Sequence, residues 1–196
     1  MFLKTLITPG RVFRDIADGN ELVIHAVHRQ TFLLVILPPI FAWVGATTFG
    51  WRLGAEDPLY FDNTARIIIS FFYAMALGFG YITTVLLASW MAKTYGAKGD
   101  LEATGALITV IVAPLSIASI AHLYPQVFFN VLVMIPAVIW SMNLLYRGLP
   151  VVMQTPPERG MLMSSSLVGW LLVAFVSLLG ISAGLWTYGI GPSVGV

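Results

Sequence analysis

The stretch from Leu101 to Arg147 constrains this chain most, because it holds two long apolar runs separated by a short break. In the first run, Ala103 to Leu123, His122 is the only ionisable side chain, and the second run, Val127 to Tyr146, carries no charge. Each run is long enough to cross a hydrocarbon core about 30 Å thick as a helix. The break is only Tyr124-Pro125-Gln126, so we expect two antiparallel helices that are neighbours.

Composition extends this prediction to the whole chain. Of its 196 residues, 58% are hydrophobic and 10% are charged, whereas a soluble domain has about 25% charged residues. We therefore predict an all-α integral membrane protein with five transmembrane helices and an N-terminal cytoplasmic amphipathic helix. The predicted parts are a cytoplasmic segment at 1–30, spans at about 31–50, 67–92, 103–123, 127–146 and 162–189, and a short periplasmic tail at 190–196.

The distribution of basic residues predicts the orientation, because loops rich in Lys and Arg stay in the cytoplasm. The predicted topology places eight basic residues on the side of the N-terminus and two on the other side. The eight are Lys4, Arg11, Arg14, Arg29, Lys93, Lys98, Arg147 and Arg159, and the two are Arg52 and Arg66. We expect a multi-pass protein of the inner (plasma) membrane, with its N-terminus in the cytoplasm, its C-terminus in the periplasm and no cleaved signal peptide.

Prolines inside the hairpin are the first candidate functional positions. Pro114 and Pro136 each free a backbone carbonyl that lipid cannot satisfy. We therefore expect both prolines to face protein, with Ser116 and Asn143 as the polar side chains near them.

Polar side chains in the same two spans are the other candidates. Ser116, Ser119 and His122 recur every third residue in the first run, and Asn130 and Asn143 lie in the second. Asparagines in spans hydrogen-bond across helices, and we favour such packing over a polar pathway. Ser119 and His122 could act as nucleophile and base one turn apart, but no partner acid or oxyanion element accompanies them. We favour a structural role over this catalytic one: the two serines bond to carbonyls near Pro114, and His122 lies at the membrane interface.

Several classes of function are disfavoured. The spans contain no acidic residue, and the chain has no HExxH or phosphate-loop motif, so we expect a protein that is not an enzyme and has no cofactor. The absence of cysteine removes thiolate metal sites. A net charge of +1 gives no case for nucleic acid as a partner.

The predicted cytoplasmic face carries two apolar surfaces. One is the apolar side of an amphipathic helix that begins near Pro9. The other follows Tyr146 to Pro150, where we expect the fourth span to end with Gly148 just past the helix and a stiff proline-rich loop beyond it. We expect the two surfaces to pack on each other or on a common partner, although each could instead lie flat on lipid. The residues of this predicted cytoplasmic cap are Val12, Phe13, Ile16, Arg147, Pro150 and Val152.

Four stretches of the chain resemble the bacterial branch of the Yip family, the Ypt/Rab-interacting membrane proteins. They are Thr8 to Arg14 (TPGRVFR), Leu123-Tyr124-Pro125, Leu144 to Pro150 (LLYRGLP) and Pro157-Glu158-Arg159-Gly160. The resemblance implies a five-helix membrane domain with a cytoplasmic N-terminus. Eukaryotic members bind prenylated small GTPases in vesicle traffic, whereas bacterial members have no settled activity and offer no catalytic residues to carry over.

Two functional hypotheses follow. The first is a Yip-like multi-pass protein that acts through protein or lipid contacts at its cytoplasmic face. The alternative is a channel, transporter or lipid-handling protein with a polar pathway between proline-kinked helices. Membrane lipids are the expected partners, and a further membrane or cytoplasmic protein and the oligomeric state stay open.

Overall fold

The structure is a computed structural model that describes residues 8–52 and 57–187. Its helices are α2 (Pro9–Ala17), α3 (Glu21–Thr48), α4 (Asn63–Tyr95), α5 (Leu101–Ala118), the short 3-10 helix η1 (Ser119–Leu123), α6 (Val127–Val152) and α7 (Pro157–Thr187). Five segments, α3, α4, α5 with η1, α6 and α7, are long and apolar enough to cross a membrane. The predicted all-α fold with five spans is therefore confirmed. Three predicted parts lie outside the described residues: the tail at 190–196, residues 1–7 of the cytoplasmic segment and residues 188–189 of the fifth span.

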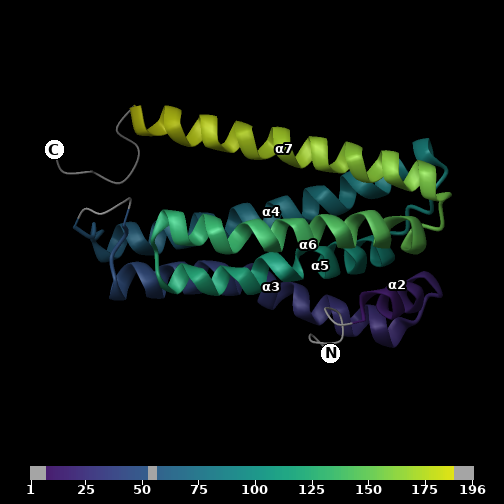
Figure 1. The fold of residues 1–196 in the computed structure, drawn as a ribbon, viewed down its shortest axis with the longest axis horizontal. Helices are drawn as coiled ribbons and strands as arrows, with labels where there is room; N and C mark the ends of the chain where they lie inside the picture. The colour runs from purple at the N-terminus through teal and green to yellow at the C-terminus, as the bar shows by residue number, and fades with distance from the viewer. Residues whose placement is uncertain (1–7, 53–56, 188–196) are drawn as a thin grey trace.

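The long helices run side by side along the long axis of the molecule (Figure 1). At one end, α2 lies beside the end of α6, and we call this the α2 end. The opposite end holds the α3–α4 loop and the turn between η1 and α6, and we call it the turn end. Helix α5 is central, because it contacts α2, α3, α4 and α6 and is buried without a break from residue 104 to residue 111.

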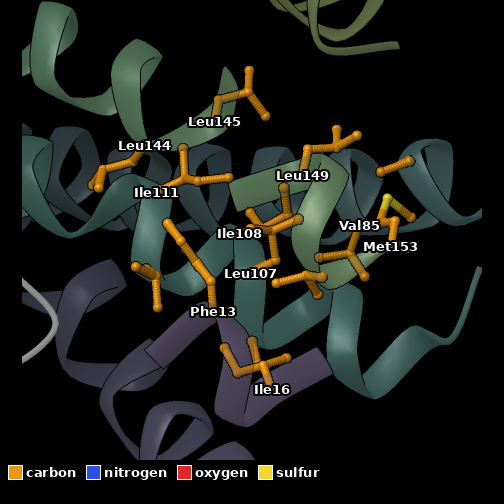
Figure 2. Close-up of a cluster of buried hydrophobic side chains, with 14 of the residues drawn as sticks. Phe13, Ile16, Val85, Leu107, Ile108, Ile111, Leu144, Leu145, Leu149 and Met153 are labelled. Carbon is orange, nitrogen blue, oxygen red and sulfur yellow. The ribbon is translucent and has the colours of Figure 1, made fainter. Parts of the chain in front are cut away.

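An apolar core fills the α2 end (Figure 2). Phe13 and Ile16 of α2 meet Leu107 of α5, Leu149 of α6 and Met153 just after α6 there, and each of these side chains is at most 2% exposed. The apolar stripe of α2 is thus covered by the chain itself. The removal of such side chains from water is the main stabilising term at this end.

Hydrogen bonds between loops close the same end. The Gln154 side chain donates to the Ala17 carbonyl at the end of α2 (2.8 Å), and the Lys98 amide donates to the Met153 carbonyl (2.7 Å). Gln154 has a φ of 47°, a left-handed conformation that is uncommon outside glycine. The loop between α6 and α7 is therefore held in one conformation against both α2 and the α4–α5 loop.

The fourth span extends further than the sequence predicted. Helix α6 continues through Gly148 and Pro150 to Val152, so the prediction that the span ends at Tyr146 to Pro150 with Gly148 beyond the helix is wrong. A proline near a helix end removes only one hydrogen bond, which the helix tolerates here. Gly148 is needed for packing instead, because a Cβ at this position would lie 2.6 Å from Cζ of Phe13.

The prolines of the hairpin have different surroundings. Pro114 is buried, as expected, but Pro136 is exposed on the outer face of α6, which contradicts the prediction that it faces protein. Its apolar ring is compatible with lipid, and a helix can absorb a freed carbonyl by local adjustment. Asn143 is half-buried on α6, and its side chain makes no hydrogen bond to any residue that the structure describes.

The Ser116 hydroxyl serves a different proline from the expected one. It donates to the Leu34 carbonyl at 2.9 Å, which is the carbonyl that Pro38 frees four residues later in α3. The bond therefore joins α5 to α3 at the point where two consecutive prolines weaken α3. The expectation that this serine serves a carbonyl near Pro114 is wrong, because a helix of the bundle far away in sequence supplies the acceptor.

Candidate functional site

Backbone hydrogen bonds fix the loops at the turn end. Trp51 and Leu59 exchange two bonds of 2.8 Å across the α3–α4 loop. The Arg52 amide donates to the Pro125 carbonyl (3.0 Å), and the Val127 amide donates to the Arg52 carbonyl (3.2 Å). The loop after α3 is thereby attached to the turn before α6, and the two form a shared rim.

A close approach between α3 and η1 positions His122. A Cβ added at Gly45 would lie 2.8 Å from the Leu123 carbonyl oxygen and closer still to that of His122. Only glycine allows the two backbones to approach so closely. The position of the His122 ring is therefore set by α3 as much as by its own helix.

Between these elements lies a cavity of about 420 Å³, the turn-end cavity. Residues of α3, α4, η1 and α6 and of both connecting segments line it. Its walls are mainly apolar and aromatic, with Trp43, Trp51 and Phe61 among them. A concave, mostly apolar site of a few hundred Å³ with a few polar groups is typical of a small-ligand site.

The first polar feature of this cavity is a chain of three side chains that all line it. The Asn130 amide nitrogen donates to the carbonyls of Tyr124 and Gln126 at 2.9 Å, so its oxygen faces Nδ1 of His122 at 2.6 Å. This network assigns the proton to Nδ1 and leaves Nε2 as the acceptor for the Tyr73 hydroxyl at 3.2 Å. The chain Tyr73–His122–Asn130 thus has its ring nitrogens and amide donors occupied.

The second polar feature is Arg66, at the start of α4. Its Nε is buried and has no hydrogen-bond partner, and the same holds for Nε of Arg52 nearby in the rim. Within residues 8–52 and 57–187 neither arginine pairs with a carboxylate. Asp62 is occupied elsewhere, because its carboxylate accepts from the amides of Thr64 and Ala65 at the start of α4.

A second cavity of about 300 Å³ lies deeper, and we call it the mid-bundle cavity. Its lining includes Tyr73, which also lines the turn-end cavity. The hydroxyls of Ser116, Ser119 and Thr84 that border it bond to helix carbonyls. The space that remains is apolar, which suits a hydrocarbon chain better than an ion.

The structure separates the predicted serine and histidine roles. The Ser119 hydroxyl donates to the Ser116 carbonyl at 2.5 Å, whereas the His122 ring bonds to Tyr73 and Asn130. His122 and Asn130 therefore belong to the turn-end cavity, and Ser116 and Ser119 to the mid-bundle cavity. No group of His, Asp, Glu or Cys in the described part of the chain could hold a metal ion.

The predicted cap residues lie at the α2 end. Val12, Phe13, Ile16 and Val152 are at most 6% exposed, Pro150 is half-buried and Arg147 is exposed. The apolar members therefore contact the chain itself.

Sequence reasoning missed Tyr73 and Arg66. Tyr73 lies deep within a span, away from the interface where tyrosines gather, and Arg66 is one of the few basic residues on its side of the predicted topology. Both unusual positions can be seen in the sequence. Whether these side chains line the same cavity as His122 depends on how each helix is rotated about its axis.

Comparisons with known proteins agree with this fold. Residues 3–186 match the Yip1 domain family. The inner membrane protein YohC of Escherichia coli strain K12 is 28% identical over 184 residues, which cover 92% of this chain and 93% of that protein. The same protein from Escherichia coli O6:H1 strain CFT073 gives the same identity and coverage. No solved structure shows a significant match.

Proposed function

The chain belongs to the Yip1 domain family, and we propose that it acts in the inner membrane as a lipid-binding protein without catalytic activity. The turn-end cavity carries this proposal, because it is apolar, lined by several helices and bordered by a few fixed polar groups. Such a composition favours binding over conduction, because a conducting pathway needs polar groups that are free to bind its cargo.

The structure gives less support to apolar contacts at the predicted cytoplasmic face. The apolar side chains expected to pack on each other or on a common partner are buried within the chain, among α2, α5 and α6. A protein partner at that face would meet the polar side of α2, where Arg11 and Arg14 lie, together with Leu22, which is 84% exposed. We keep this contact as a second candidate on the strength of Leu22.

A cavity-filling substitution tests lipid binding. Ala42 lines the turn-end cavity, whereas Val44 on the same helix is exposed on its surface. We expect Ala42→Trp to lower the lipid retained by the protein in detergent by about tenfold, which corresponds to about 1.4 kcal/mol of lost binding free energy. Native mass spectrometry of the purified chain measures the retained lipid. Val44→Trp introduces the same side chain outside the cavity and should retain lipid normally; equal retention by both variants would contradict the proposal.

The orientation in the membrane is a second part of the proposal. The excess of basic residues at the α2 end supports a cytoplasmic α2 end and a periplasmic turn end. Reporter fusions should therefore give cytoplasmic signals after Lys98 and Glu158 and periplasmic signals after Asp57 and at Val196. A cytoplasmic signal at Val196 would contradict five spans in this orientation.

A further inference from the structure

We propose that the turn-end cavity selects an anionic phospholipid, with Arg66 binding the phosphate and a hydrocarbon chain reaching the mid-bundle cavity. This inference rests on the proposed lipid-binding function and names the class of lipid. Three observations support it: the charge of Arg66, the hydrogen bonds that already occupy the other polar side chains of the cavity, and the position of Tyr73 in the lining of both cavities.

Arg66 is a cation without a counterion among the described residues. Its Nε is buried and unbonded, and the described residues that line the cavity include no Asp or Glu. Arg66 as a whole is half-buried, and a partly buried charge at the membrane is costly unless an opposite charge compensates it. A ligand that brings one negative charge into the cavity would provide that compensation.

The remaining polar groups favour a phosphate. Tyr73, His122 and Asn130 have their strong donors occupied within the chain, so Arg66 supplies the free donors. The planar guanidinium presents parallel N–H groups that match two phosphate oxygens. Ser70 lies one turn further along α4 and also lines the cavity, so its hydroxyl lies on the same helix face as Arg66.

The absence of a carboxylate in the described lining also bears on the head group. A zwitterionic lipid such as phosphatidylethanolamine brings an ammonium group that needs an anionic partner. Phosphatidylglycerol brings the same phosphate without an amine. The cavity is therefore complementary to a lipid with a net negative charge.

Tyr73 gives the direction of the chain. It lines both cavities. Its hydroxyl already bonds to His122, so it offers no free donor to a ligand. The proposed hydrocarbon chain runs from Arg66 along the Tyr73 ring toward the mid-bundle cavity. The hydroxyls of Ser116 and Ser119 at that level are already bonded.

Titration of the delipidated, full-length protein in detergent tests the proposal. Phosphatidylglycerol, phosphatidylethanolamine and oleate are added separately, and binding is measured by native mass spectrometry. We expect the unaltered chain to prefer phosphatidylglycerol over phosphatidylethanolamine by about tenfold, as one charge-assisted contact would give. Arg66→Gln should abolish this preference and leave phosphatidylethanolamine binding unchanged, and Arg66→Lys should keep part of it.

Arg52→Gln is the matched control, because Arg52 also has a buried, unbonded Nε but does not line the cavity. It should keep the full preference, and thermal unfolding should show that all variants are folded. A preference that survives Arg66→Gln overturns the proposal, and so does tighter, Arg66-dependent binding of oleate, which would indicate a free fatty acid. If none of the lipids binds and Ala42→Trp has no effect, the lipid-binding function itself fails, which is a distinguishable result.

Discussion

Gly45→Ala is expected to destabilise the turn end strongly, although it adds a single methyl group. The new Cβ would lie 2.8 Å from the Leu123 carbonyl oxygen and closer to that of His122. Both are backbone atoms, so relief requires α3 and η1 to separate. Overpacking of this kind costs about 1–3 kcal/mol or more. The apparent midpoint of thermal unfolding in detergent should fall, and the lipid retained in the turn-end cavity should fall with it.

Gly169→Ala is the control for this experiment. Gly169 lies in α7, and a Cβ there would meet nothing within 4 Å. Alanine favours the helix by about 1 kcal/mol relative to glycine, so this variant should be as stable as the unaltered chain or slightly more stable. Equal midpoints for Gly45→Ala and Gly169→Ala would show that α3 and η1 do not approach as closely as the structure indicates.

The number and type of the helices could be predicted from the sequence because membrane spans are marked by length and apolar composition alone. The hairpin break at Tyr124 to Gln126 was predicted for the same reason. The end of the fourth span was not, because Gly148 and Pro150 are common just beyond a helix. Their actual role depends on Phe13, which is far away in sequence and packs directly against Gly148.

The candidate site was predicted only in part. His122 and Asn130 were identified because polar side chains are rare in spans, but they were assigned to different roles. Their link through one hydrogen bond, and the approach of Tyr73 and Arg66, depend on the rotation of α4 and α6. A span that is apolar on all sides gives no periodicity from which that rotation could be read.

Phe13→Ala is the second substitution with a large expected effect. Phe13 is 2% exposed and lies in the core between α2, α5 and α6 (Figure 2). Removal of a buried phenylalanine ring costs about 3–5 kcal/mol, and Phe13 has the largest of the three buried side chains of α2. The midpoint of unfolding should fall, although Val12 and Ile16 stay in the core, and trypsin should cleave faster at Arg11 and Arg14. Leu22→Ala, at a residue that is 84% exposed, should change stability by no more than about 0.5 kcal/mol.

A double substitution distinguishes loss of this specific contact from general weakening. Gly148→Ala alone would place a methyl group 2.6 Å from the Phe13 ring and 2.9 Å from the Leu107 side chain, and should also loosen α2. In the Phe13→Ala background the two closest ring atoms are absent and only the Leu107 side chain remains close, so the added methyl group should cost less. We expect a coupling of about 0.5–3 kcal/mol between the two substitutions. Strictly additive effects would mean that α2 does not pack on α6 at Gly148, and that the apolar stripe of α2 is covered by lipid or by a partner instead.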